Sequence, residues 1–202
     1  MPDSVGYDSA GVSPVSDAVT EPAKILVVGP FGVGKTTLIG TVSEIEPLRT
    51  EEPMTVASVG VDSLDGVEGK TTTTVALDFG RISLDTIALY LFGMPGQQRF
   101  WSLWEGLEKG AVGALVLVDL RRLDAAFAVL DQLGTGRIPF VVAINDFPGT
   151  PRYADDEVRQ ALALPEAVVL HCDARDKRSS VDALITLVSH ALTCLDSAEA
   201  RP

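Results

Sequence analysis

One eight-residue segment, from Gly29 to Thr36, constrains this chain more than any other feature, and its sequence is Gly-Pro-Phe-Gly-Val-Gly-Lys-Thr. It matches the pattern Gly-x-x-x-x-Gly-Lys-Ser/Thr, follows the apolar run 25–28 and precedes a stretch typical of a helix over 36–42. The glycines let the backbone turn its N–H groups inward, and the helix points the positive end of its dipole at the same place. Lys35 is then expected to reach the β- and γ-phosphates of a nucleotide, and Thr36 to bind Mg²⁺. The segment therefore predicts a phosphate-binding loop (P-loop).

The residues expected around the phosphates belong to this loop and to the first turn of the helix: Gly29, Phe31, Gly32, Val33, Gly34, Lys35, Thr36 and Thr37. The alternative is a glycine-rich turn between strand and helix that binds nothing. The buried strand before the motif and the helix after it favour the phosphate loop.

Apolar runs alternate with helical patterns along the rest of the chain. Strands are expected over 25–28, 73–79, 86–92, 114–118, 140–144 and 167–170, and helices over 36–42, 100–108, 123–133, 155–164 and 180–195. A turn at 80–83 would join the second and third strands into an antiparallel hairpin, and Ser179 or Ser180 would cap the last helix. Residues 47–70 have the composition of a long loop. This order predicts an α/β fold of three layers, a P-loop NTPase with a mostly parallel six-stranded sheet and one antiparallel edge strand.

Length and composition indicate one domain. The 202 residues are expected to form a domain over 23–196, with a disordered N-terminal tail over 1–22 and a short C-terminal tail over 197–202. The net charge of −12 opposes binding to nucleic acid and to anionic lipid. No apolar run approaches the ~20 residues of a membrane span, and the N-terminus is unlike a signal peptide. We expect a cytoplasmic protein without direct membrane insertion, which only a partner could recruit to a membrane.

Three further segments extend the pattern beyond the phosphate loop: residues 70–80 (Lys-Thr-Thr-Thr-Thr-Val-Ala-Leu-Asp-Phe-Gly), 93–97 (Gly-Met-Pro-Gly-Gln) and Asn145 after an apolar strand. Together with the loop they resemble the Ras-like small GTPases, in particular bacterial proteins of the MglA type and the GTPases of actinobacterial conservon clusters. The resemblance covers about residues 24–195. It implies a Ras-like G domain, a switch that binds GTP or GDP with Mg²⁺ and hydrolyses GTP slowly with stimulation from a partner. A Roadblock/longin-type regulator and a sensor-kinase-like complex are the partners that it implies.

The resemblance also implies roles in two switch segments. Thr74, or Thr73 as second choice, is expected to join Thr36 as a Mg²⁺ ligand when triphosphate is bound; the alternative is a solvated run of threonines. The Gly96 N–H is expected to bond the γ-phosphate, and Gln97 to orient the attacking water. Gly93 stands where most of the family has an aspartate, a loss that MglA-type proteins share.

One acidic and one basic side chain could complete this site. Asp119 ends an apolar strand and could replace the missing carboxylate, although we favour a role in ordering the following loop with Arg121 and Arg122. Arg99 could stabilise the transition state from within the chain, or lie on the surface as an ordinary arginine. The aromatic residues after it, Phe100, Trp101 and Trp104, suit either the core or a partner surface.

The base-binding end departs further from the family. Ras-like proteins recognise guanine through Asn-Lys-x-Asp, whereas this chain has Asn145-Asp146-Phe147-Pro148, with proline at the carboxylate position. The segment 173–175 stands where the family has Ser-Ala-Lys, and the Ala174 N–H is expected to meet guanine O6. The residues assigned to the base are Asn145, Asp146, Asp173, Ala174 and Arg175. Guanine specificity is thus implied by the resemblance alone.

Two other functions remain open at this point. The altered switch II and base motifs would suit a binding module that holds nucleotide without hydrolysing it and recruits a partner. A P-loop kinase for a small metabolite is disfavoured, because the chain lacks an arginine-rich lid and an acidic residue to activate an acceptor.

Overall fold

The computed structural model describes residues 18–47, 52–53, 72–73, 77–84, 86–96, 104–135 and 138–199. Its elements in chain order are β1 (Glu21–Val28), α1 (Lys35–Val42), β2 (Glu52–Pro53), β3 (Thr72–Thr73), β4 (Asp78–Leu84), β5 (Ile87–Gly93), α2 (Trp104–Leu107), β6 (Ala111–Val118), the 3₁₀ helix η2 (Leu120–Ala126), α3 (Phe127–Thr135), β7 (Phe140–Asn145), α4 (Asp155–Ala161), β8 (Val168–Cys172) and α5 (Lys177–Glu199).

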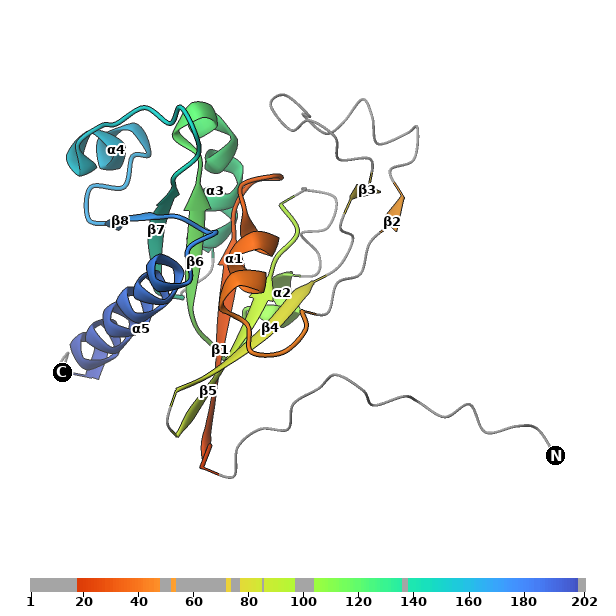
Figure 1. The fold of residues 1–202 in the computed structure, drawn as a ribbon. Coiled ribbons are helices and arrows are strands. Elements are labelled where there is room, and N and C mark those ends of the chain that lie inside the picture. Colours follow the sequence, from red (N-terminus) through yellow and green to blue (C-terminus); the bar gives the residue numbers. More distant parts are fainter. Residues whose placement is uncertain are drawn as a thin grey trace.

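A six-stranded sheet in the order β4-β5-β1-β6-β7-β8 forms the middle of the molecule (Figure 1). β4 pairs antiparallel with β5, and the other neighbours pair parallel. This confirms the predicted sheet with its antiparallel edge strand. A second pair, β2 with β3, forms a small antiparallel sheet within and beside the segment predicted as a long loop.

Both faces of the sheet are covered by helices, which explains the continuous apolar runs of its strands. Ile25 and Val27 of β1 face a core that includes side chains of α1 and α5. Leu26 and Val28 face the opposite core, which α3 and α4 complete. The parallel strands all end at one edge of the sheet, so the loops after β1, β5, β6, β7 and β8 gather there (Figure 1).

The antiparallel hairpin lies further along the chain than predicted. Residues 80–83, predicted as its turn, belong to β4, and the turn follows Leu84. Gly80 is needed where α1 crosses the strand, because a Cβ there would lie 2.7 Å from Ile39 Cγ2. The polar residues are held by Glu44, which accepts hydrogen bonds from Arg81 Nε and the Ser83 hydroxyl at 2.6 Å each. A glycine and two polar side chains thus resemble a turn although tertiary contacts hold them in a strand.

Several helix and strand ends also differ from the predictions. α5 begins at Lys177, and its cap is Asp176, whose Oδ1 accepts from the Ser179 N–H at 2.7 Å, so capping by Ser179 or Ser180 is wrong. The helix predicted over 123–133 is preceded by the 3₁₀ turns of η2, and α4 ends before Ala163, which has φ 56°. The helix predicted over 100–108 is described only as α2.

β1 starts at Glu21 because it pairs with β5 from Ile87 onward, and α5 continues to Glu199. The chain is therefore ordered slightly beyond both ends of the predicted domain. Residues 1–17, most of the predicted N-terminal tail, lie outside the described residues. None of the helices described in these ranges is both long and apolar enough to cross a bilayer.

Candidate functional site

The phosphate loop connects β1 to α1 at the edge where the parallel strands end. Gly29, Gly32 and Gly34 have φ of 146°, 75° and 107°, conformations that other residues rarely adopt. A Cβ on Gly29 would lie 2.4 Å from the Leu117 carbonyl oxygen, which is backbone and cannot give way. The glycines of the motif therefore serve the close packing of this loop against β6 as well as its curvature.

Lys35 and Thr36 begin α1 at the end of this loop. The Lys35 ammonium donates hydrogen bonds to the carbonyl oxygens of Gly29 and Pro30, each at 2.7 Å, so it lies across the loop. The Thr36 hydroxyl donates to Asp78 Oδ2 at 2.6 Å. Thr37, also assigned to the phosphates, is exposed in the first turn of α1. A part-buried ammonium beside the N-terminus of a helix is an arrangement that suits an anion.

The segment after β5 packs directly against this loop. The Met94 N–H donates to the Val27 carbonyl at 2.9 Å, which extends the pairing of β5 with β1. A Cβ on Gly96 would lie 2.5 Å from Gly29 O and 2.8 Å from Phe31 N. Only glycine allows such an approach, so Gly96 is in contact with the phosphate loop, while the predicted bond from its N–H to a γ-phosphate stays a prediction. Gln97, Arg99 and Thr74 lie outside the described residues, as do Phe100 and Trp101.

Asp78 at the start of β4 is a residue of the site that the sequence analysis missed. Its side chain is only 4% exposed and contacts Thr36 through Oδ2. In the sequence, Asp78 is indistinguishable from an ordinary polar residue in a half-buried strand. Its pairing with Gly93 could have identified it, but that pairing is known only when the register of the hairpin is correct.

Asp119 follows β6 and orders the next loop, the role that the sequence analysis favoured. Oδ1 accepts from the Arg121 N–H at 3.0 Å, and both carboxylate oxygens accept from the Arg121 guanidinium. Burial alone would raise the pKa of this carboxyl, but the bonds from Arg121 hold the pKa below its usual value. Arg122 reaches from the same turn to the carbonyl of Phe31 at 3.3 Å, which joins η2 to the phosphate loop.

We expect Asp119→Asn to lower the free energy of unfolding by roughly 1–2 kcal/mol at pH 7, because a charged acceptor of three N–H groups is lost. The lowered pKa means that the carboxylate stabilises the fold above its ordinary pKa of about 3.9 and loses this effect as pH falls through the folded-state value. Urea unfolding at a series of pH values should therefore show a constant gap between wild type and variant from pH 7 to about 5, which narrows below about 4. Asp131→Asn, at an exposed position of α3, is the control. A gap that widens with acidification would contradict this assignment.

The end of the site that the sequence analysis assigned to the base is organised by Asn145, which is buried at the end of β7. Its Nδ2 donates to the Val33 carbonyl at 2.9 Å, and its Oδ1 accepts from the Ala174 N–H at 3.0 Å. One side chain therefore joins the phosphate loop to the loops after β7 and β8. The Ala174 N–H, predicted to meet guanine O6, is engaged by Asn145 in this structure.

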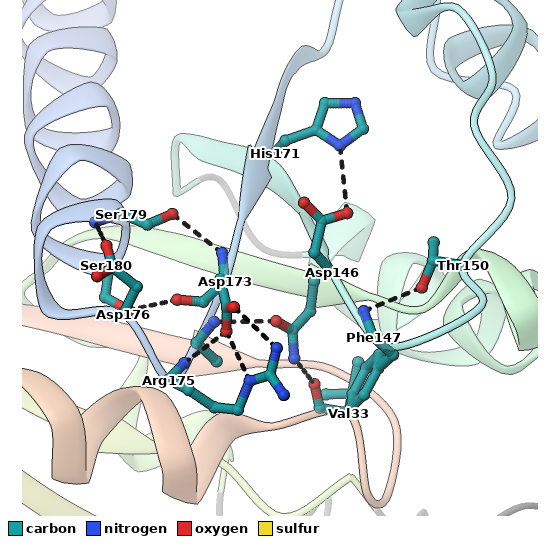
Figure 2. Close-up of polar contacts among 12 residues, drawn as sticks. Val33, Asp146, Phe147, Thr150, His171, Asp173, Arg175, Asp176, Ser179 and Ser180 are labelled. Carbon is teal, nitrogen blue, oxygen red and sulfur yellow. Dashed lines mark hydrogen bonds and ion pairs between the residues drawn. The ribbon is translucent and has the colours of Figure 1, made fainter.

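Figure 2 shows the surroundings of the two acidic residues assigned to the base, Asp146 and Asp173. Asp146 turns toward His171, with 3.9 Å between Oδ1 and Nδ1, and lies 3.5 Å from Arg152. Asp173 binds Arg175 through both oxygens at 2.9 and 2.8 Å, and the hydrogen bonds from Arg175 lower the pKa of Asp173. Asp173 is thus held by Arg175, whereas the buried Oδ1 of Asp146 has no hydrogen-bond partner among the described residues.

Pro148 stands where Ras-like proteins are expected to carry the base-recognising carboxylate, and in the structure it is part of a turn. The Thr150 N–H donates to the Phe147 carbonyl at 3.0 Å, and Gly149 has φ 78°. Proline followed by a left-handed glycine is the usual sequence of a type II turn. The Arg121 guanidinium stacks on the Phe147 ring, 4.2 Å from its centroid, and holds this turn against η2.

The fold and the phosphate loop define a P-loop nucleotide-binding protein with a Ras-like G domain. A solved structure, the Arl6 BBS3 small GTPase from Trypanosoma brucei with the bound nucleotide analogue GppNp, superimposes with a TM-score of 0.59; the match covers 85% of this chain and 98% of that chain at 17% identity. At this identity the match concerns the fold.

A family model described as conserved hypothetical ATP binding protein matches residues 27–194, and the chain belongs to that family. An uncharacterised protein of Methanocaldococcus jannaschii, MJ1339, is 30% identical over 124 residues, which are 60% of this chain and 68% of that protein. The Ras-related protein Rab-11B of Dictyostelium discoideum is 34% identical over 97 residues, which are 48% of this chain and 37% of that protein. Rab-18-B of Danio rerio is 29% identical over 110 residues, which are 54% of this chain and 46% of that protein. The aligned part spans less than half of either Ras-related protein.

Proposed function

We propose that this protein is a GTP-binding molecular switch that hydrolyses GTP slowly in the presence of Mg²⁺. The observation that carries the proposal is the contact between Gly96 and the phosphate loop, with 2.5 Å between a Cβ built on Gly96 and Gly29 O. A γ-phosphate in the loop would have to be accommodated by both segments together. Its presence or loss would then change the position of the chain after Gly96, which is how a switch of this class signals.

Mg²⁺ fits the residues at the start of α1. Thr36 offers a hydroxyl oxygen whose proton is donated to Asp78, so its lone pairs are available to a cation. We propose Thr36 as the Mg²⁺ ligand from the loop and Thr74 as the ligand from switch I. When bound, the metal would neutralise charge on the β- and γ-phosphates.

Hydrolysis would depend on how the protein positions the reacting groups, since phosphoryl transfer requires little covalent chemistry from the protein. We assign Gln97 to the attacking water, Lys35 to the phosphates and Arg99 to the developing charge. Stimulation by a Roadblock/longin-type regulator, and membrane recruitment through a sensor-kinase-like complex, belong to the same proposal. A protein that binds nucleotide without hydrolysing it is the alternative, and zero phosphate release in a single-turnover assay would support it.

Adenine nucleotides are the second candidate ligand, and two observations favour them. Pro148 provides no carboxylate for guanine, and the family bears the description of an ATP-binding protein. The nucleotide that remains bound through purification, identified by mass, tests the base directly. A guanine nucleotide supports the switch proposal, an adenine nucleotide supports the second candidate, and failure of both GTP and ATP to bind by calorimetry with Mg²⁺ would overturn nucleotide binding altogether.

We expect GTP to be preferred over ATP by less than about 100-fold, because a site without a charged partner for guanine discriminates weakly. Pro148→Asp should raise this preference by about 10- to 100-fold, since the new carboxylate would accept from guanine N1 and N2, which adenine cannot match. Pro148→Asn is the control of similar size without the charge, and its gain should be smaller. Displacement of a fluorescent nucleotide by GTP or ATP measures both ratios. An unchanged ratio in Pro148→Asp would mean that this turn does not face the base.

A further inference from the structure

The outer face of α5 carries an apolar stripe that the described part of the chain leaves open. Ile185, Leu192 and Leu195 are 50%, 55% and 57% exposed. Val181 and Val188 continue the stripe and are partly buried against the core beneath the helix. In Figure 1, α5 runs along one side of the molecule, where it packs against β6, β7, β8 and α1. Apolar side chains that gather on one helix face, rather than singly, mark a surface for a partner.

The stripe follows a heptad repeat. Its positions are 181, 185, 188, 192 and 195, so the spacing alternates between four and three residues. This narrow stripe is typical of the seam between two paired helices. A separate, adjacent set of α5 side chains faces the sheet, and its members are at most 2% exposed: Ala183, Leu184, Leu187 and Ala191. The helix therefore has two apolar faces, and the fold uses only one of them fully.

The charges at the two ends of the stripe are opposite in sign. Lys177 and Arg178 lie in the first turn of α5, and Asp196 directly follows the last apolar position of the stripe. All three residues are exposed. Two copies of this helix side by side in parallel would bring like charges together. In an antiparallel pair, each basic end meets the acidic end of the other copy, so the stripe is complementary to itself in that orientation.

We propose that α5 pairs antiparallel with α5 of a second copy of this chain, so that the protein forms a homodimer. In the register of an antiparallel coiled coil, Ile185 of one copy packs beside Val188 of the other, and Val181 packs beside Leu192. The same contacts occur twice, because the two-fold axis passes through the middle of the stripe. One apolar face therefore covers the other completely.

The ends of the stripe complete this pairing. In the same register Arg178 reaches Asp196 of the partner copy, and Asp182 lies four residues further along its own helix. Each Arg178 guanidinium would therefore lie between two carboxylates. The stripe from Arg178 to Asp196 is about 27 Å long, which is short for a stable interface, so we expect a dissociation constant in the micromolar range.

This dimer leaves the candidate nucleotide site open in both copies. α5 begins at the edge of the sheet where the parallel strands end and runs toward the opposite edge (Figure 1). Antiparallel pairing therefore places the two phosphate loops toward opposite ends of the paired helices. The inference is independent of the proposed function, and it stands or falls without reference to which nucleotide the protein binds.

The first test is sedimentation equilibrium of the full chain between about 1 and 200 µM, a range that spans the expected dissociation constant. The average mass should rise from that of one chain toward that of two. Leu192→Asp should raise the dissociation constant at least about tenfold, because it places a charge in the apolar seam. Thr193→Asp is the matched control, since it adds the same charge at an exposed position about 100° around the helix, and it should stay within about threefold of wild type.

Thermal unfolding at the lowest concentration, where wild type is monomeric, separates lost pairing from lost folding. Leu192 is more than half exposed, so Leu192→Asp should melt within a few degrees of wild type there. At high concentration wild type and Thr193→Asp should melt at a higher temperature than at low concentration, whereas Leu192→Asp should not. A wild-type mass of one chain at every concentration, or a dimer that Leu192→Asp leaves intact, would overturn the proposal.

The second test determines the orientation of the helices. Arg178→Glu and Asp196→Arg should each weaken the homodimer about fivefold or more, because like charges then meet at both ends of the seam. An equimolar mixture of the two variants should associate within about threefold of wild type, since every helix end then meets the opposite charge. Single variants that associate as well as wild type, or a mixture no better than either variant alone, would show that the helices do not pair antiparallel and would overturn the proposal.

Discussion

Lys35→Ala should lower the affinity for nucleotide by about 100-fold or more, because each charge-assisted hydrogen bond to a phosphate contributes about 1.5–3 kcal/mol. In the structure the ammonium lies across the loop and donates to Gly29 O and Pro30 O. Those carbonyls can be solvated when the side chain is removed, so the free energy of unfolding should fall by less than about 2 kcal/mol. Calorimetric titration with GTP and Mg²⁺ measures the first effect, and urea unfolding measures the second.

Lys24→Ala is the matched control for this variant. Lys24 belongs to β1, the strand that leads into the phosphate loop, but lies before the buried part of that strand and donates to the Lys109 carbonyl. Removing it takes away the same charge from the protein without touching the loop. Affinity should stay within about twofold of wild type, since exposed charges far from a ligand act weakly. Binding by Lys35→Ala within tenfold of wild type would show that the Gly29–Thr36 loop does not hold phosphates as proposed.

The fold and the phosphate loop were predictable from the sequence because their signals are local. The motif from Gly29 to Thr36 specifies a loop conformation through glycines that are adjacent in the chain. Continuous apolar runs such as 114–118 and 140–144 predict strands buried on both faces, and β6 and β7 confirm them. The order of such runs is enough to predict a parallel sheet whose binding residues gather at one edge.

The hairpin and Asp78 were not predictable in the same way, since both depend on contacts between distant segments. Residues 80–83 contain a glycine and polar side chains, which favour a turn until Ile39 and Glu44 of another segment are brought against them. The strand was predicted over 73–79, whereas β4 spans Asp78–Leu84, and this shift changes which residue lies opposite Gly93. The sequence could therefore show that an aspartate was missing at position 93 and could not show which side chain lies opposite that position.

The base-binding loop is an intermediate case. The Pro148-Gly149 dipeptide is a local turn signal, and the structure has a turn there. The side chain of Asp146 points toward His171 of the next strand, and no local sequence pattern predicts that orientation.

Asn145→Ala should be the most destabilising of the site variants, lowering the free energy of unfolding by about 2–4 kcal/mol. The variant leaves two buried groups without partners, the Val33 carbonyl and the Ala174 N–H. That is a large part of the roughly 5–15 kcal/mol by which a domain of this kind is stable. Asp146→Asn changes the adjacent residue, whose side chain is 30% exposed and turned to His171, and should lower stability by about 1 kcal/mol or less. Urea unfolding without nucleotide compares the two, and equal losses would contradict the special position of Asn145.

The effect of Asn145 on binding should exceed what lost stability alone explains, because its side chain holds the phosphate loop and the base-binding loops in one arrangement. Leu133→Ala provides the comparison: Leu133 is buried in α3 on the face away from α1 and α5, and its loss should destabilise by about 2–5 kcal/mol. A cavity there leaves the loops in place, so nucleotide affinity under native conditions should change less than about threefold. Asn145→Ala should have a stability similar to that of Leu133→Ala. It should nevertheless bind nucleotide at least about tenfold more weakly than wild type, because part of the binding energy is then used to order the loops. Equal affinities in the two variants would mean that the loops keep their arrangement without Asn145, and that its hydrogen bonds serve the fold alone.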